Sequence, residues 1–103
     1  SLILNRFSGN SLFILDEPEA SLSPSRQMTF MAKINHLVHE NSQFIIATHS
    51  PILLAFPEAT VYQVSETGVE LIDYKDTEAY QITQAFLKNP ERMFKELFKH
   101  LEQ

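Results

Sequence analysis

The sequence contains no cysteine, and only two of its 103 residues are glycine. Without cysteine the chain forms no disulfide, offers no thiolate to a metal ion and has no cysteine nucleophile. This composition is compatible with a reducing cytoplasm, where we expect the protein to reside. Neither Gly9 nor Gly68 stands next to a lysine, so the chain has no glycine-rich loop that could wrap backbone N–H groups around phosphates.

Positive charge and long apolar runs are also scarce. Eight lysine and arginine residues stand against 13 acidic ones, giving a net charge of -5 without any basic block. A stand-alone binder of nucleic-acid phosphates is therefore not expected, and any nucleic-acid role would come through a partner. No apolar run approaches the roughly 20 residues that span a bilayer, and no signal-peptide pattern is present. We expect no membrane contact.

The composition is that of a globular protein, with 44% hydrophobic and 11% aromatic residues. The chain begins at Ser1 and enters an apolar segment, residues 2–7, that resembles the last turns of an amphipathic helix capped by Gly9. A chain of this length buries only about 60 to 65% of its unfolded surface. We therefore expect residues 1–103 to form a single partial domain that leaves a core face bare and self-associates.

Two continuous apolar runs, residues 12–15 and 44–47, are typical of strands that are buried on both faces of a parallel sheet. Between them, apolar residues recur at helical spacing and predict a helix from Pro24, with Ser23 as its N-cap, to about Glu40. A strand–helix–strand unit makes a right-handed crossover, so its strands run parallel. Their carboxyl ends then meet at one edge of the sheet, where open α/β folds bind ligands.

The second half of the chain predicts a hairpin and helices. A short helix is expected at residues 51–56, and two strands at 60–64 and 69–74 are expected to form an edge hairpin through a four-residue connection. A helix should begin at Asp76 or Thr77 and end near Lys88. Asn89 and Pro90 start a last helix with one apolar stripe, formed by Met93, Phe94, Leu97, Phe98 and Leu101. Core packing against the sheet is favoured for this stripe over a partner groove.

An acidic pair, Asp16 and Glu17, directly follows the first apolar run. A buried strand can hold the first carboxylate rigidly for a metal ion, while the second faces the other way and can orient or deprotonate a water. That arrangement is what a magnesium-dependent phosphoryl-transfer site needs. An acidic pair alone is equally compatible with a strand end that is simply exposed to solvent. The neighbouring residues must therefore decide between a magnesium site and an exposed strand end.

Those neighbours form two motifs. The first run continues as LDEPEASLSP at residues 15–24, and the second continues as ATHSP at residues 47–51. The first motif resembles a Walker B motif that runs into a D-loop, and the second resembles the switch region of ABC-type ATPases with its histidine. More narrowly, the sequence is similar to soluble ATPases of the RecF and SMC branch. The motifs that carry this resemblance lie in roughly the first 60 residues. The remaining residues resemble the family only in the expected order of their strands and helices.

The resemblance implies an α/β fold, the C-terminal part of a P-loop NTPase domain with parallel core strands, an edge hairpin and flanking helices. It implies that Asp16 helps to hold Mg²⁺, that Glu17 is the general base and that His49 senses the γ-phosphate. An imidazole can donate to a phosphoryl oxygen without the fixed charge of an arginine. The D-loop, which in the family crosses to the opposite subunit of a dimer, corresponds to Ala20, Ser21, Leu22 and Ser23. Serine at position 23 departs from the aspartate usual in transporters.

The implied activity is hydrolysis of ATP to ADP and phosphate with Mg²⁺, in a head-to-head homodimer. The implied partners are ATP, the rest of the same ATPase domain, and a DNA or protein on which the parent acts. Because positioning of the triphosphate dominates phosphoryl-transfer catalysis, we expect the 103 residues alone to be inactive. The alternative is a non-catalytic interaction or dimerisation module derived from an ATPase.

Two weaker candidates stand outside these motifs. His36 and His39 could present two imidazoles to a metal ion, but no third ligand is evident and a solvated helix face is favoured. Ser50 beside His49 could belong to a hydrolase triad. Against this, no G-x-S-x-G motif is present, and adjacent side chains point apart on an extended chain.

Overall fold

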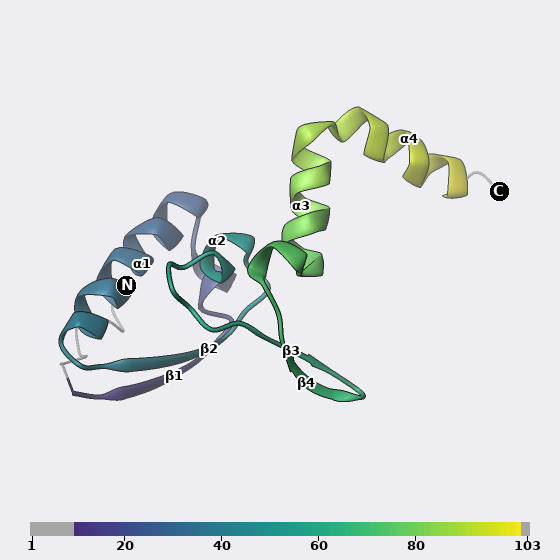
Figure 1. Cartoon of the computed structure of the whole chain (residues 1–103). Helices are drawn as coiled ribbons and strands as arrows, with labels where there is room; N and C mark the ends of the chain where they lie inside the picture. The colour runs from purple at the N-terminus through teal and green to yellow at the C-terminus, as the bar shows by residue number, and fades with distance from the viewer. Residues whose placement is uncertain (1–9, 102–103) are drawn as a thin grey trace. The chain divides into compact units, whose positions relative to one another are not determined.

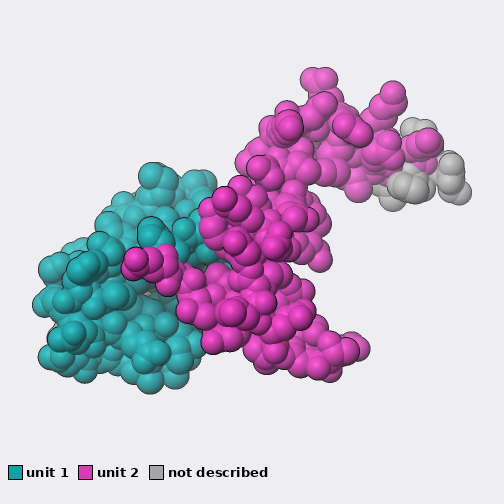
Figure 2. Space-filling model, in the orientation of Figure 1, with its two compact units in different colours: residues 1–57 teal, residues 58–103 magenta. Residues whose placement is uncertain are grey.

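The computed structural model describes residues 10–101, so the helical end expected at residues 2–7 lies outside the described residues. The chain divides into two compact units, residues 1–57 and residues 58–103, which Figure 2 colours separately. The expectation of a single partial domain stays a prediction. Within residues 10–101, no helix combines the length and apolar character needed to cross a bilayer.

The first unit is built on a strand–helix–strand unit, as expected (Figure 1). Its elements are β1 (Leu12–Asp16), a 3₁₀ turn (Pro18–Ser21), α1 (Pro24–His39), β2 (Gln43–Ala47) and α2 (Pro51–Leu54). β1 and β2 pair in parallel, with Asp16 opposite Ala47 at their carboxyl ends. The predicted parallel pair is confirmed, and at the same edge Glu17 follows β1 directly while Thr48 and His49 follow β2.

Helix α1 begins and ends where its sequence provides the caps. The Ser23 hydroxyl accepts a hydrogen bond from the Arg26 N–H at 3.3 Å, and Pro24 occupies the first turn, so the predicted N-cap is confirmed. At the other end Asn41 adopts a left-handed backbone (φ 65°), which asparagine tolerates better than most residues, and its N–H donates to the Val38 carbonyl. The chain thereby turns back into β2.

One face of the β1–β2 pair carries the core of this unit. The buried apolar side chains of the described residues are Phe30, Ile34, Leu37 and Leu53, from α1 and α2. Partly buried strand residues pack against them, among them Phe13 and Phe44, whose ring centroids lie 4.8 Å apart. The helical spacing of the apolar residues in α1 therefore predicted the core-facing side of that helix.

The opposite face of the strand pair is exposed, and here the expectation of burial on both faces is wrong. Ile14 is 73% exposed, and Leu12 and Ile45 are exposed beside it. The strands alternate between packed and exposed residues because both helices of this unit pack on one face. A bare core face, which the chain length led us to expect, is present.

The second unit begins with a hairpin of β3 (Tyr62–Ser65) and β4 (Gly68–Leu71). Ser65 pairs with Gly68, so the connection has two residues and the expected four-residue connection is wrong. The Ser65 hydroxyl accepts from the Thr67 N–H at 3.3 Å, and Gly68 supplies a φ of 136°, which together close the tighter turn. In the described residues β3 and β4 pair only with each other and form a separate two-stranded sheet. The expected position of this hairpin at the edge of the parallel sheet is therefore not observed.

The second strand also ends earlier than expected. β4 stops at Leu71, and a 3₁₀ turn (Tyr74–Asp76) follows because the Asp73 carboxylate accepts from the Lys75 N–H at 2.9 Å. The Thr77 hydroxyl then accepts from the Tyr80 N–H at 3.3 Å, so Thr77 rather than Asp76 caps the next helix.

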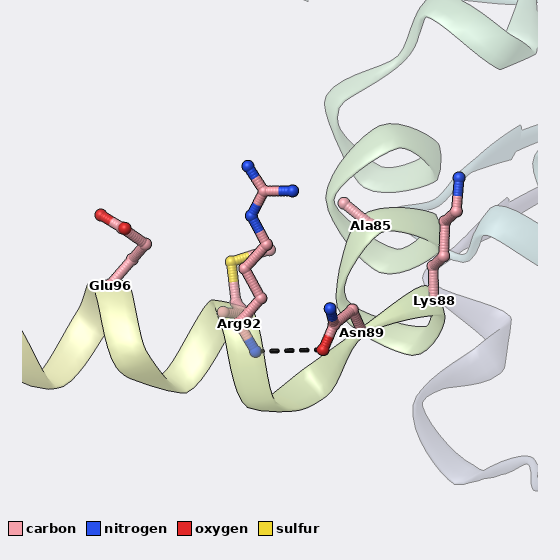
Figure 3. Close-up of a pocket in the computed structure, with 6 residues that line it drawn as sticks. Ala85, Lys88, Asn89, Arg92 and Glu96 are labelled. Carbon is pink, nitrogen blue, oxygen red and sulfur yellow. Dashed lines mark hydrogen bonds between the residues drawn. The ribbon is translucent and has the colours of Figure 1, made fainter.

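Helices α3 (Glu78–Lys88) and α4 (Pro90–Leu101) complete the second unit. They meet at Asn89, whose side-chain oxygen accepts from the Arg92 N–H at 3.2 Å and starts α4 as predicted (Figure 3). In this stripe Phe94, Leu97 and Phe98 are 42%, 50% and 53% exposed. The favoured core packing of the stripe against the sheet stays a prediction. Its described ring contacts are local: Phe94 packs on Phe86 of α3 and stacks on Phe98.

Candidate functional site

The chain turns sharply directly after β1. Glu17 adopts a left-handed backbone with φ 45° and ψ 55°, a conformation that costs a non-glycine residue about 1–2 kcal/mol. Its N–H donates to the Ala47 carbonyl at 2.7 Å, which fastens the turn to the end of β2. Strained backbone of this kind concentrates at functional sites, where a side chain must take one direction.

That turn brings Glu17 to His49. Glu17 Oε1 lies 3.5 Å from His49 Nδ1, although the two residues are 32 positions apart in the sequence. The side chains are 56% and 87% exposed, and ion pairs so exposed contribute about 0–1 kcal/mol. Both groups are open to a ligand, and their mutual attraction is too weak to fix the imidazole.

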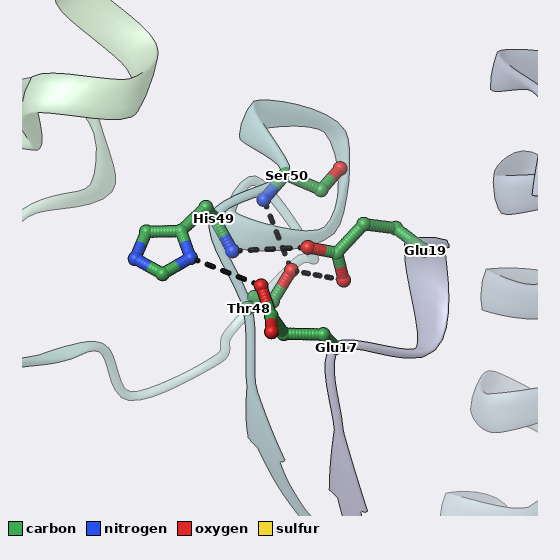
Figure 4. A network of polar contacts seen from close by, with 5 residues as sticks. All are labelled: Glu17, Glu19, Thr48, His49 and Ser50. Atoms are coloured by element: carbon green, nitrogen blue, oxygen red, sulfur yellow. Dashed lines mark hydrogen bonds and ion pairs between the residues drawn. The ribbon is translucent and has the colours of Figure 1, made fainter. Parts of the chain in front are cut away.

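A second glutamate joins the two strand ends more firmly (Figure 4). The Thr48 hydroxyl donates to Glu19 Oε1 at 2.7 Å, and the His49 N–H donates to Glu19 Oε2 at 3.1 Å. The Ser50 N–H in turn donates to the Thr48 hydroxyl oxygen at 3.0 Å. The Glu19 carboxylate therefore bridges the 3₁₀ turn after β1 and the segment after β2.

These donors also set the charge state of Glu19. Partial burial raises its pKa, but hydrogen bonds from the Thr48 hydroxyl, from its own N–H and from the His49 N–H outweigh that effect, together with the nearby His49 charge. The net result is a pKa below the ordinary value of 4.5. Glu19 is thus a charged acceptor at neutral pH.

A buried polar pair continues this network into the core. The Ser50 hydroxyl donates to Gln27 Oε1 and accepts from the Leu53 N–H at 3.2 Å, so it caps α2. Gln27 Nε2 donates to the Leu22 carbonyl at 3.2 Å. Because the Ser50 hydroxyl is buried and committed to these bonds, it does not serve as the nucleophile of a hydrolase triad.

The other predicted site residues lie along the same connection. Asp16 is exposed at the end of β1, on the strand face that also carries Ile14. Three of the four D-loop positions are exposed, whereas Leu22 packs against the core. Ser23 caps α1, which gives its hydroxyl a local role at the position where a D-loop aspartate is usual.

Among the side chains that the structure describes, residues 10–99, no group of three or more His, Cys, Asp or Glu is suited to a metal ion. His36 pairs with Glu40 at 2.8 Å on an exposed face of α1, and His39 Nδ1 lies 2.7 Å from the Asn35 carbonyl, in line with the solvated-face reading. Mg²⁺ needs no protein cage, because it takes one or two carboxylates and completes its shell with waters and phosphate oxygens. The exposed carboxylate of Asp16 fits that requirement.

Sequence reasoning gave no role to Glu19 or Gln27. The burial of Gln27 could have been predicted from the sequence. It stands three residues before Phe30 and seven before Ile34, a spacing that places it on the buried side of α1. The contacts of Glu19 could not have been predicted in this way, because its partners lie 29 and 30 positions away and are brought close only by the pairing of the strands.

A hollow of about 390 Å³ lies in the second unit, at the junction of α3 and α4 (Figure 3). Its lining residues are Ala85, Lys88, Asn89, Arg92, Met93 and Glu96. None of the site residues predicted from sequence is among them. Its lining includes both positive and negative side chains, Lys88, Arg92 and Glu96. The Asn89 side-chain oxygen already accepts the hydrogen bond that caps α4.

Comparison with known proteins identifies the family. The sequence of residues 3–54 matches the family described as AAA ATPase domain, and these residues include the acidic pair, Glu19 and His49. No curated protein and no solved structure matches the chain. The match covers half of the chain and contains the whole polar network between the two strand ends. The chain belongs to the AAA ATPase domain family.

Proposed function

We propose that this chain carries the hydrolytic residues of an ATPase site that converts ATP and water to ADP and phosphate. The observation that carries the proposal is the meeting of Glu17 and His49, with Oε1 and Nδ1 3.5 Å apart, at the carboxyl ends of two parallel strands. Membership in the AAA ATPase domain family supports it. Ligands of open α/β sheets bind at this edge.

Each residue has a separate task in this proposal. Glu17 orients the attacking water and takes its proton, which an exposed carboxylate on a fixed backbone can do. His49 donates a hydrogen bond to an oxygen of the γ-phosphate, where negative charge develops. Asp16 would hold Mg²⁺, and the ion would supply positive charge to neutralise the phosphates.

The loop after Glu17 has a role between subunits in this proposal. Ala20, Ser21 and Ser23 are exposed, and we assign them to a D-loop that reaches the nucleotide of the opposite subunit in a homodimer. Leu22 anchors the loop, because it packs on the core of its own unit. Ser23 offers no carboxylate to that contact, and its hydroxyl caps α1.

The rest of the site comes from outside these 103 residues in this proposal. The sequence has no phosphate-binding loop, so another part of the ATPase domain supplies it and the chain alone is inactive. The assembled ATPase is ABC-type, resides in the cytoplasm and acts on DNA or on another protein.

A second candidate function is a non-catalytic interaction module. The exposed apolar face formed by Leu12, Ile14 and Ile45 favours it, because an apolar sheet face of this kind marks a contact surface. In that case Glu17 would be dispensable and the exposed face would not.

The test is Mg²⁺-dependent ATP turnover by the intact ATPase, with its phosphate-binding loop present. We expect Glu17→Gln to lower kcat by about 100-fold or more, in the range seen for removal of a general base. Glu70→Gln, an exposed glutamate on β4, is the matched control and should leave kcat unchanged. Turnover that survives in Glu17→Gln would reject the proposal and favour the interaction module.

A further inference from the structure

We propose that Glu19 is a positioning residue for His49, which sets the backbone from which the imidazole reaches the γ-phosphate. This inference rests on the proposed function, because the role of His49 is assigned there. It assigns a task to a residue between the acidic pair and the D-loop that has no part in either.

The geometry that supports it is a pair of hydrogen bonds from Thr48 and His49 to the Glu19 carboxylate, which we call the Glu19 grip. One carboxylate oxygen of Glu19 accepts from the Thr48 hydroxyl at 2.7 Å, and the other accepts from the His49 N–H at 3.1 Å. The same Thr48 oxygen accepts from the Ser50 N–H at 3.0 Å. One side chain from the turn after β1 thus holds Thr48 and His49 directly, and Ser50 is linked to it only through the Thr48 hydroxyl (Figure 4).

His49 depends on this grip because nothing described holds its ring firmly. The side chain is 87% exposed, and its ring has one described side-chain contact, the 3.5 Å approach to Glu17. Where packing does not restrain a side chain, the position of its backbone decides what it can reach. Glu19 holds that backbone at the N–H of His49 itself.

The occupied oxygens of Glu19 argue against a direct role in chemistry. Both accept hydrogen bonds from the protein, and the residue is half-buried, whereas Asp16 and Glu17 are exposed. Each oxygen keeps a second lone pair, but the carboxylate faces the protein, so the exposed Asp16 and Glu17 are better placed to bind Mg²⁺ or a water. Among the three acidic residues of the motif, Glu19 is the one committed to the neighbouring segment.

The chemistry of a substitution separates positioning from charge. In Glu19→Gln the amide oxygen can accept from the His49 N–H, while the NH₂ group donates to the Thr48 hydroxyl oxygen, so both links survive without the charge. In Glu19→Ala both links are lost. A positioning role predicts rescue by glutamine, and a charge or metal role predicts that glutamine and alanine are equally damaging.

The first experiment measures kcat and KM for ATP in the intact ATPase. We expect Glu19→Ala to lower kcat by about 10- to 100-fold, the size of effect that a displacement near 1 Å produces, with KM changed by less than about 2-fold. Glu19→Gln should recover kcat to within about 3-fold of wild type, and Glu70→Gln should match wild type. A glutamine variant as slow as the alanine variant would overturn the proposal.

The second arm repeats Glu19→Ala in a His49→Ala background. A residue that acts through His49 has nothing left to position there, so we expect no further loss of kcat. An undiminished second loss would overturn the proposal. If His49→Ala alone leaves turnover unchanged, the proposed role of His49 fails instead, and the two failures are thereby distinguished.

A third measurement is independent of activity and uses the 103-residue chain. Amide hydrogen exchange at His49 should accelerate about 10-fold or more in Glu19→Ala, while exchange at Ile34 in the core of α1 stays within about 2-fold. Equal exchange at His49 in the two proteins would overturn the grip itself, whatever the turnover assays give.

Discussion

The two units of this chain are held together by different kinds of interaction. In the first unit, helices bury apolar side chains against a strand pair, and a buried polar pair, Gln27 and Ser50, joins three segments. In the second unit, Thr77 is the buried residue of the described part, and it serves as a helix cap. The first unit relies on tertiary packing and the second on local structure.

The polar contacts show the same difference in their reach along the chain. Glu19 and Thr48 are 29 residues apart, and Gln27 and Ser50 are 23 apart. Among the described residues of the second unit, the longest side-chain hydrogen bond spans six residues, from Gln81 to Lys75. Fixing a catalytic side chain requires links between distant segments, and all the candidate catalytic residues lie in the unit that has them.

The largest expected effect breaks the core of the first unit. Phe30→Ala should lower the free energy of unfolding by about 3–5 kcal/mol, because Phe30 is 5% exposed and its removal leaves a cavity. Phe98→Ala in α4 is the matched substitution, and it should cost about 0.5–1.5 kcal/mol, mainly the stacking on Phe94. Urea denaturation measures both, and similar losses would contradict the contrast between the units.

A smaller effect is expected from the buried polar pair. Gln27→Ala leaves the Ser50 hydroxyl and the Leu22 carbonyl without this partner, so we expect a loss of about 1–3 kcal/mol. Ser65→Ala removes an exposed hydroxyl from the hairpin turn and should change stability by less than about 0.5 kcal/mol. A loss for Gln27→Ala no greater than that for Ser65→Ala would show that the network adds nothing to stability.

The fold of the first unit was predictable from the sequence because its signals are strong and local. Two apolar runs and a capped helical pattern gave the strands, the helix Pro24–His39 and their parallel pairing. The meeting of Glu17 and His49 followed from that pairing. The left-handed backbone of Glu17 was not predictable, because glutamate has no preference for that conformation.

Other features depend on information that no local pattern contains. The grip of Glu19 requires the register of two strands, and residue types alone do not give it. The stripe of α4 has the spacing of a core-facing helix, yet Phe98 and Leu97 remain half exposed. Periodicity shows that a helix has an apolar side, but it does not show what lies against that side.

The acid sensitivity of the first unit provides a third prediction. The pKa of Glu19 is lower in the folded chain than its ordinary value of 4.5, so its contribution to stability is complete above about pH 4.5 and is lost as the pH falls through the folded value. Glu19→Gln should therefore be less sensitive to acid below about pH 4.5 than the wild-type chain. The midpoint of urea denaturation, measured from neutral pH to about pH 3, tests this.

The control for that prediction is Glu70→Gln in the second unit. Its carboxylate is exposed, and the variant should lose stability with acid as the wild-type chain does. Parallel pH curves for wild type and Glu19→Gln would contradict the account of this carboxylate.

The smallest effect on folding, and the largest on association, is expected at the exposed strand face. Ile14→Lys should change the free energy of unfolding by less than about 0.5 kcal/mol, because Ile14 is 73% exposed. It should nevertheless reduce self-association, which we predict for the wild-type chain from this bare apolar face. Light scattering tests both chains, and a monomeric wild-type chain would contradict the prediction.

The central claim is that the carboxyl ends of β1 and β2 form one hydrolytic site, and a double-mutant cycle tests it most directly. The measurement is the single-turnover rate of ATP hydrolysis by the intact ATPase in Glu17→Gln, His49→Ala and the double variant. If both residues act in one site, the double variant will be about as slow as the slower single variant. Rate losses that multiply, or single variants that hydrolyse ATP at the wild-type rate, would contradict the claim.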